Sequence, residues 1–366
     1  MKKLLILASL LAIAAACTKS YDVETVSQPQ INFGSWNDVM TKAPRTGFAA
    51  NEEFDVFGFK WNDGPDNETN VFNGDDVKYD GTSSWSYSPV RFWDSNFDNY
   101  TFFAAFPKDN LAAEAAADDY AQRGLFISNE LTYDGSNEVL LVAQKKDVVR
   151  ANYGAIVPLV FKHTGSLVDI KFKKHTDLDD AVVAVTSIKL SGIKTKGTFT
   201  VSSYDGSNDP VGTWTPDATP TVNAASAAVA DAPYVNTSSV SLAADTGTST
   251  ATAADLFTSL VTMPQTLGTA SGPQITLTYT ITTGTGGSAQ TNTFTDKVIY
   301  FGEFDKTDPD DGVAPEKDNS DPRISSWAPG VHYTYYITIN ANAIQFSASI
   351  AAWDTTDATG HYYLFN

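Results

Sequence analysis

Side chains that could carry out catalysis or bind a metal are few in this sequence and poorly spaced for either task. The four histidines (His163, His175, His332 and His361) show no metal-ligand spacing. The chain contains neither a G-x-S-x-G motif nor a phosphate-binding loop. The acidic residues 308–312 miss the spacing of an EF-hand and are typical of a solvated loop. The residue types therefore indicate a protein that is not an enzyme and uses no metal or cofactor.

The cysteine at position 17 is the one residue whose context indicates a chemical modification. Lys2 and Lys3 precede an apolar run, residues 4–16, which is too short to span a membrane and is typical of a secretory signal. Cys17 ends this run and is the only cysteine. The segment resembles a bacterial lipobox, in which the thiol is acylated with chains such as palmitate, and such chains anchor a protein in a membrane. The alternative is an incidental cysteine near a signal-peptidase site.

Charge and composition narrow the class of protein further. The 366 residues include 43 acidic and 24 basic side chains, so the net charge is −19. This acidity argues against binding to nucleic acid, whose phosphates require a basic surface. Only 18% of the residues are charged, while Thr, Ser, Gly and aromatic residues are abundant. Such a composition favours an all-β protein outside the cytosol.

Alternating apolar and polar residues predict strands along most of the chain. In residues 275–282 every second residue is apolar and the others are all Thr, so one face of this strand is buried. Residues 167–174 alternate in the same way. The one helical pattern of useful length is a short insertion at residues 111–122. Two tandem β-sandwiches are the architecture we expect, with a boundary near residue 180, between segments 46–180 and 181–366.

Several local patterns together resemble the fimbrillin family, the pilus subunits of Bacteroidota. No single pattern is specific, but their order behind a lipobox is characteristic of that family. They are Trp85-x-Tyr87-x-Pro89-x-x-Phe92-Trp93, residues 100–107, Val160-Phe161-Lys162-His163, residues 192–199, Met263-Pro264-Gln265-Thr266, and Trp327-x-x-Gly330-x-x-Tyr333 with Trp353 after it.

The resemblance implies a fold and a mode of assembly. Family members are similar to two tandem transthyretin-like β-sandwiches, are exported as lipoproteins to the surface of the outer membrane, and form fimbriae that serve adhesion. A trypsin-like protease removes the first strand, and a strand from a neighbouring subunit fills the groove that is left. This is β-augmentation, in which backbone hydrogen bonds give strength and alternate side chains give specificity.

Carried over to this chain, the resemblance makes residues 1–17 a lipoprotein signal peptide and residues 18–45 a propeptide. The cap strand would contain Ile31 and Phe33, which lie two residues apart and so face the same way. Arg45 is the first choice for the cut and Lys42 the second, because both lie between the cap strand and the first regular strand, residues 54–59. The family often has Thr-Arg-Ala here, whereas this chain has Thr41-Lys42-Ala43 with Arg45 two residues later, so the position of the cut stays open. The alternative is an ordinary loop arginine behind a permanent edge strand at residues 28–35.

The resemblance also implies partners: other pilin subunits in a homo- or heteropolymer, the maturation protease, and the outer membrane through lipid. The tail is a candidate donor strand, in which Tyr362 and Leu364 would face one way and Tyr363 and Phe365 the other. It could equally be the last strand of the second sandwich. A competing function is a surface lipoprotein that binds glycans by stacking sugars on exposed tryptophans (Trp61, Trp85 or Trp214).

Overall fold

The computed structural model describes residues 28–35, 48–62, 69–82, 84–111, 125–135, 140–204, 210–217, 235–236, 239–242, 253–306, 323–341 and 344–352. These residues form five β-sheets, so the expected all-β fold is confirmed. Helical structure in these ranges is limited to short 3-10 turns at Arg150–Asn152, Thr176–Leu178, Gly286–Ser288 and Phe301–Glu303. Most of the expected insertion at 111–122 lies outside the described ranges. Within them, no helix is long and apolar enough to cross a membrane.

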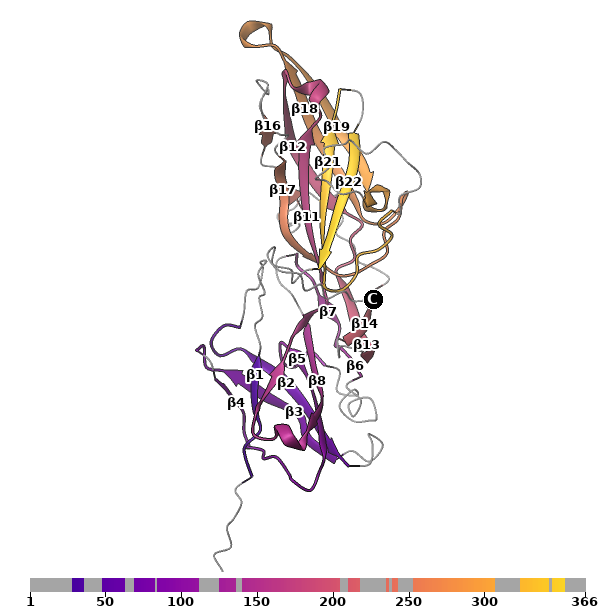
Figure 1. Ribbon diagram of the computed structural model, residues 1–366. Coiled ribbons are helices and arrows are strands. Elements are labelled where there is room, and N and C mark those ends of the chain that lie inside the picture. Colours follow the sequence, from indigo (N-terminus) through magenta and orange to yellow (C-terminus); the bar gives the residue numbers. More distant parts are fainter. Residues whose placement is uncertain are drawn as a thin grey trace, which may run out of the picture.

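A six-stranded sheet forms the centre of the N-terminal half, at the bottom of Figure 1. Its order is β10 (Lys162–His163), β8 (Leu141–Val149), β5 (Asn99–Phe106), β2 (Glu53–Trp61), β3 (Thr69–Tyr79) and β4 (Trp85–Ser86). All residues of β5 after Asn99 are buried. A strand with no wet face must lie in a sheet that is covered on both sides.

Two separate groups of strands supply these covers. On one face lie β1 (Asn32–Ser35) and β9 (Ile156–Leu159), and Phe102 of β5 points into this layer, which we call the cap core. The other face is covered by β13 (Lys196–Tyr204), β14 (Pro210–Pro216), β6 (Phe126–Ile127) and β7 (Leu131–Thr132). Phe103, the next residue of β5, stacks there on Phe126 and shares a cluster of buried residues with Phe199 and Trp214, which we call the junction core.

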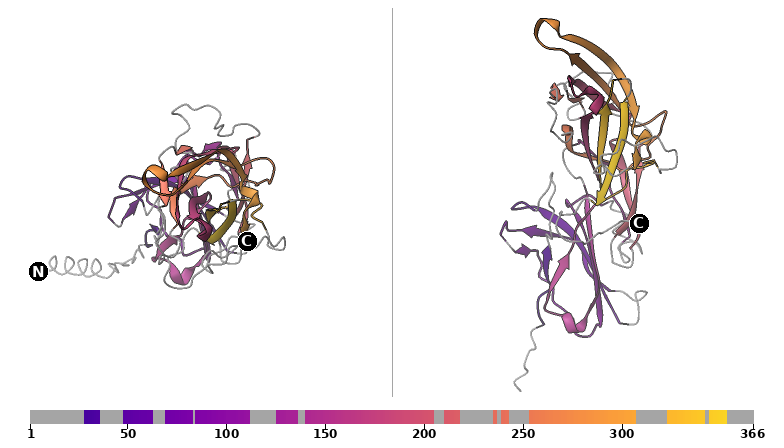
Figure 2. Two further views of the ribbon diagram at one scale, coloured as in Figure 1. Left: turned by 90° about the horizontal axis from the view of Figure 1, so that it is seen from above. Right: turned by 45° about the horizontal axis from the view of Figure 1, so that its top comes forward.

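The C-terminal half is a sandwich of two sheets around a third cluster of buried residues. One sheet contains β17 (Ala254–Thr262), β11 (Ser166–Lys174), β21 (Val331–Ile339), β22 (Ile344–Ala352) and β20 (Asp305–Lys306). The other contains β15 (Val235–Asn236), β16 (Val240–Leu242), β12 (Ala181–Ser191), β18 (Gln274–Thr283) and β19 (Gln290–Tyr300). The molecule is elongated, and the β18–β19 hairpin projects from the end opposite β1 (Figures 1 and 2).

The expected boundary near residue 180 falls in the turn between β11 and β12. Strands that precede this boundary in the sequence pair with strands that follow it, in both halves of the molecule. Before the boundary, β11 joins the sheet of β17 and β21, and after it β13 pairs with β6 and β7. The division into 46–180 and 181–366 stays a prediction, and each segment contributes strands to the layers of the other.

Candidate functional site: the first strand and its groove

The segment with the expected cap residues lies between two backbone segments as an inserted strand. On one side β1 pairs in parallel with β9, with Asn32 opposite Ile156 and Phe33 opposite Val157. On the other side Gln30 forms an antiparallel bridge with Phe92. We call the surface that β1 fills, formed by residues 91–93, β9 and the buried aromatic rings beneath, the β1 groove.

Hydrogen bonds fix the segment along its antiparallel edge. The Ile31 amide donates to the Arg91 carbonyl at 3.0 Å, and the Trp93 amide donates to the Pro29 carbonyl, also at 3.0 Å. The Tyr87 hydroxyl donates to the Ile31 carbonyl at 2.6 Å. Removing the segment would take these partners away, although the Tyr87 hydroxyl keeps a hydrogen bond of 3.3 Å to the Arg91 carbonyl, and a polar group that loses its partner is costly where it is buried.

The side chains that the sequence assigned to the cap point into the core. Ile31 is fully buried and Phe33 is 4% exposed. Four aromatic rings surround Phe33, with centroids 5.2–6.5 Å away in edge-to-face geometry: Phe54, Phe72, Tyr87 and Phe102. Burying two such side chains stabilises by roughly 3–6 kcal/mol in total. The expected orientation of Ile31 and Phe33 toward one surface is thus what the structure has.

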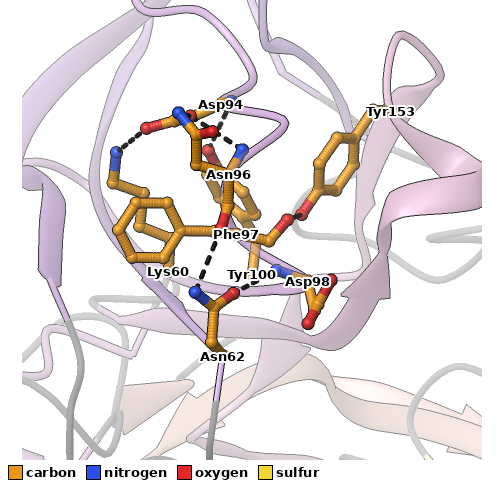
Figure 3. Close-up of polar contacts among 8 residues, drawn as sticks. All are labelled: Lys60, Asn62, Asp94, Asn96, Phe97, Asp98, Tyr100 and Tyr153. Carbon is orange, nitrogen blue, oxygen red and sulfur yellow. Dashed lines mark hydrogen bonds and ion pairs between the residues drawn. The ribbon is translucent and has the colours of Figure 1, made fainter.

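A polar network holds the loop that follows the groove wall (Figure 3). The Lys60 ammonium lies 2.7 Å from a carboxylate oxygen of Asp94, and the same carboxylate accepts from the Asn96 amide. The hydrogen bond from Lys60 holds the pKa of Asp94 below its usual range. Asn62 bonds this loop twice, donating to the Asn96 carbonyl at 3.0 Å and accepting from the Asp98 amide at 2.9 Å.

Trp93 is the apolar end of this wall. It is 1% exposed and stacks on Tyr153 at a centroid distance of 4.6 Å. The Tyr153 hydroxyl donates to the Phe97 carbonyl, and the Tyr100 hydroxyl accepts from the Asp94 amide (Figure 3). Burial raises the pKa of Tyr100 to about 12, so this ring stays neutral at ordinary pH. The wall is therefore fixed by contacts that do not involve β1.

The remaining expected site residues lie outside the described residues. These are the lipidation residue Cys17, the processing residues Lys42 and Arg45, and the tail residues Tyr362, Tyr363, Leu364 and Phe365. The described chain stops at Ser35 and resumes at Phe48. Phe48 packs against Trp85, Phe106 and Phe161 at 4.9–5.3 Å between ring centroids. Both basic candidates therefore fall between the cap strand and a residue that is anchored in the N-terminal half.

The tryptophans that a glycan site would use are occupied by packing. Trp61 and Trp214 are 7% and 9% exposed. Trp85 is half-buried and packs against Phe48 and Phe54. Stacking of a sugar requires an open aromatic face, so the structure does not favour the alternative function of glycan binding.

Charged side chains in the described residues form pairs and small structural networks. Asp169 accepts from His332 at 2.9 Å and from the Ser259 amide at 2.6 Å, between β11, β17 and β21. Burial alone would raise the pKa of Asp169, but these two hydrogen bonds lower it. Across the part of the chain that the structure describes, no group of three His, Cys, Asp or Glu residues could hold a metal ion.

The sequence analysis missed the groove residues that lie far from the cap strand along the chain. Tyr87 and Trp93 were part of the family pattern, but nothing in their spacing indicated a bond to the Ile31 carbonyl or to Pro29. Val157 and Leu159, both buried beside β1, belong to the continuous apolar run 156–161, which the sequence analysis did not assign to a strand. A short apolar run is consistent with a buried strand, and this run was the available signal.

Comparison with solved structures finds the same fold in another protein. A fimbrial protein from Bacteroides vulgatus has the same fold, with a TM-score of 0.55 and 19% identity over 88% of this chain and 99% of that one. Weaker similarity links the chain to a C-terminally truncated tip fimbrial protein of Porphyromonas gingivalis (TM-score 0.39, 10% identity, 88% and 98% covered). A fimbrilin of the same species gives TM-score 0.39 and 8% identity, with 90% and 99% covered. None of the curated proteins matches the chain in sequence.

A match to a family model shows whether the chain shares only the fold of these proteins or belongs to their family. The model described as "Fimbrillin-like" matches residues 41–353, which is most of the chain and includes both halves of the molecule. That family consists of fimbrial proteins and not of enzymes, in agreement with the absence of catalytic motifs from the sequence. The chain therefore belongs to the fimbrillin-like family.

Proposed function

We propose that the protein is a structural subunit of a cell-surface fimbria, contributes to adhesion, and polymerises by exchange of β1 for a strand of a neighbouring subunit. The observation that carries this proposal is the burial of Ile31 and Phe33 in a segment with backbone partners on both sides. Such a strand can leave only if another strand takes over both its side-chain pockets and its hydrogen bonds.

The position of the basic residues supports proteolytic maturation. Arg45, or Lys42 as second choice, lies in the stretch 36–47 between β1 and the anchored Phe48. A cut there by a trypsin-like protease would separate the cap strand from the rest of the chain covalently. The cap would until then protect an edge that is prone to uncontrolled pairing.

Export as a lipoprotein and placement on the outer membrane complete the proposal. Cys17 would carry the acyl chains that hold the subunit in the membrane before maturation. Substitution Cys17→Ser should then abolish incorporation of labelled palmitate in cells, while Cys17 in the unaltered chain is labelled. Labelling that persists in the Cys17→Ser protein would contradict this assignment.

Strand exchange is tested by controlled proteolysis of the purified full chain. Trypsin should cut within residues 36–47 and produce ladders that resist SDS, with a new N-terminus at Thr46 or Ala43 by mass spectrometry. The double substitution Lys42→Gln with Arg45→Gln should prevent both the cut and the ladders. A cut chain that stays fully monomeric, with residues 28–35 retained, would support a permanent edge strand instead.

The donor is proposed to come from the C-terminal end of another copy or of a related subunit. Tyr362, Tyr363, Leu364 and Phe365 are the candidate residues. Deleting residues 359–366 from the full chain should leave the trypsin cut unchanged and suppress the ladders. Ladders of unchanged length and yield from the deleted chain would show that another strand is the donor.

A further inference from the structure

The outer side of β1, opposite the cap core, is lined by exposed apolar residues on both flanks. On one flank Val90 and Phe92 are 45% and 54% exposed, and on the other Ile156 and Val160 are 64% and 42% exposed. We call these four residues the outer rims of the β1 groove. Phe92 pairs with Gln30 and Ile156 with Asn32, so the rims lie directly beside β1.

This concentration of apolar surface is unusual within the described part of the chain. Nine large apolar side chains there are exposed, and four of them belong to the outer rims. The other five are spread over different strands: Ile127, Val149, Val182, Val298 and Ile350. Exposed apolar residues that gather beside a single strand mark a surface that another chain covers.

The cap strand itself leaves the rims in water. Gln30 and Asn32 are exposed. The side-chain amide of Asn32 donates back to the backbone carbonyl of Gln30 at 3.3 Å instead of covering an apolar neighbour. Gly34 has no side chain, and Ile156 lies over it: a Cβ placed there would come 2.7 Å from Cγ2 of Ile156, so an outward side chain at this position requires Ile156 to shift. The outward face of β1 is therefore polar or bare where its flanks are apolar.

We infer that the outer rims recognise the outward-facing side chains of the strand that replaces β1, and that this strand binds more tightly than the cap for that reason. The inference rests on the proposed strand exchange. It names the occupant as residues 362–365 of a second copy. These four consecutive large apolar residues would present apolar side chains on both faces of an extended strand, one toward the cap core and one toward the rims.

The last strand of the C-terminal sandwich, β22, fits the site less well. In β22, Ile344 and Phe346 alternate with Gln345 and Ser347, so only one face is apolar, as in β1 itself. Such an occupant would leave the apolar side chains of the outer rims exposed to water. A strand with two apolar faces buries the rims in addition to filling the pockets of Ile31 and Phe33. Because it buries more apolar surface than the cap does, replacement of the cap by this strand is favoured over the reverse.

Displacement of the cap from the cut full-length protein tests the inference. The trypsin-cut chain, with its N-terminal fragment still bound, is incubated with a peptide of residues 28–35 or of residues 359–366, and release of the fragment is followed by mass spectrometry. The tail peptide should cause half-displacement at a concentration about tenfold lower than the cap peptide, which corresponds to about 1.4 kcal/mol.

Substitutions in the rims separate this inference from the proposed function. In the double variant F92A/I156A the preference for the tail peptide should fall to within about twofold. The control variant V182A/V298A removes two other exposed apolar side chains, from the C-terminal sandwich, and should keep the preference. A cap peptide with Asn32→Tyr, which adds an apolar ring on the outward face, should gain potency on the unaltered protein and not on F92A/I156A.

Each result has a defined meaning. Equal potency of the two peptides on the unaltered protein, or a preference that survives F92A/I156A, would overturn the inference and leave strand exchange intact. Failure of every peptide to displace the fragment from a correctly cut chain would overturn the proposed function instead. Thermal unfolding of each variant controls for loss of fold, and Ile156→Val serves as the conservative substitution that should keep the preference.

Discussion

Phe33 makes most of the side-chain contacts that hold the cap strand. Its ring meets four other aromatic rings in edge-to-face geometry, contributed by β2, β3, β5 and the segment before Arg91. Such pairs add stabilisation beyond the area they bury. Ile31 fills the neighbouring site, whereas the intervening Asn32 is exposed and contributes little to burial.

Substitution Phe33→Ala should therefore destabilise the uncut chain strongly. Loss of a buried aromatic ring and the cavity that it leaves typically cost about 3–5 kcal/mol. Urea unfolding followed by tryptophan fluorescence measures the change. The neighbouring substitution Asn32→Ala should change the free energy of unfolding by no more than about 0.5 kcal/mol. Equal effects of the two substitutions would argue against a buried cap.

Asp55 gives the N-terminal half a dependence on pH. It lies in β2, is 7% exposed, and accepts a hydrogen bond from the Asp109 amide at 2.8 Å. Burial raises the pKa of Asp55 to about 6. The folded state therefore holds a proton that the unfolded chain releases near pH 4. This contribution to stability is complete below about pH 4 and is lost as the pH rises through 6.

Comparison of the unaltered chain with Asp55→Asn tests the direction of this pH dependence of stability. Between pH 4 and 7 the unaltered chain should lose stability relative to Asp55→Asn, because only its carboxyl group ionises. The asparagine carbonyl can still accept from the Asp109 amide. Urea unfolding at steps of one pH unit measures the difference. A difference that is flat, or that grows in favour of the unaltered chain, would contradict the raised pKa.

Among the strands, β1 differs from its neighbours in how it is held. Its residues pair with β9 on one side, the preceding residues 29–31 bond to Arg91 and Trp93 on the other side, and its covalent link to the rest of the N-terminal half runs through residues 36–47. The groove wall is fixed independently through Trp93, Tyr153 and the Lys60–Asp94 network. The wall formed by residues 91–93 can thus keep its shape when the occupant changes, whereas β9 has β1 as its only strand partner among the described strands.

The hydroxyl of Tyr87 should slow the departure of β1 after proteolysis. Substitution Tyr87→Phe keeps the ring against Phe33 and removes the bond to the Ile31 carbonyl, which is worth about 1 kcal/mol. Release of the N-terminal fragment from the cut chain should become about fivefold faster, measured by mass spectrometry over time. Tyr336→Phe, on β21 of the C-terminal sandwich, should leave this rate unchanged. An unchanged rate for Tyr87→Phe would remove Tyr87 from the retention of the cap.

The two halves of the protein are bound together by shared layers. The junction core combines Phe57 and Phe103 of the central sheet with Phe199, Trp214 and Met263 from later in the chain. The indole nitrogen of Trp214 donates to the Thr164 carbonyl at 2.6 Å, next to the start of β11. Residues after 180, together with β6 and β7, therefore bury one face of the N-terminal sheet.

A fragment of residues 46–180 should consequently fail to fold by itself. It lacks the β13–β14 cover of the central sheet, and its β11 lacks both β17 and β21. Bound ANS, broad NMR resonances and an uncooperative urea transition are the expected results, with the full chain as the folded control. A monomeric fragment with a cooperative transition would instead support the domain boundary near residue 180.

Much of the fold follows from local patterns in the sequence. The period-two alternation in residues 275–282 and 167–174 predicts the one-sided strands β18 and β11, and the Thr and Lys side chains take the outer face as expected. The same rule places Ile31 and Phe33 on one face. Alternation can be read locally because successive side chains of an extended chain point to opposite sides.

The sequence alone determined the all-β class, the inward faces of the main strands and the segment that would serve as the cap. Only the tertiary structure decided what these faces meet. The parallel pairing of β1 with β9 and the antiparallel pairing of β13 with β6 join residues more than sixty positions apart. Such pairings depend on which surfaces can be buried together at the end of folding, and no local pattern encodes that choice.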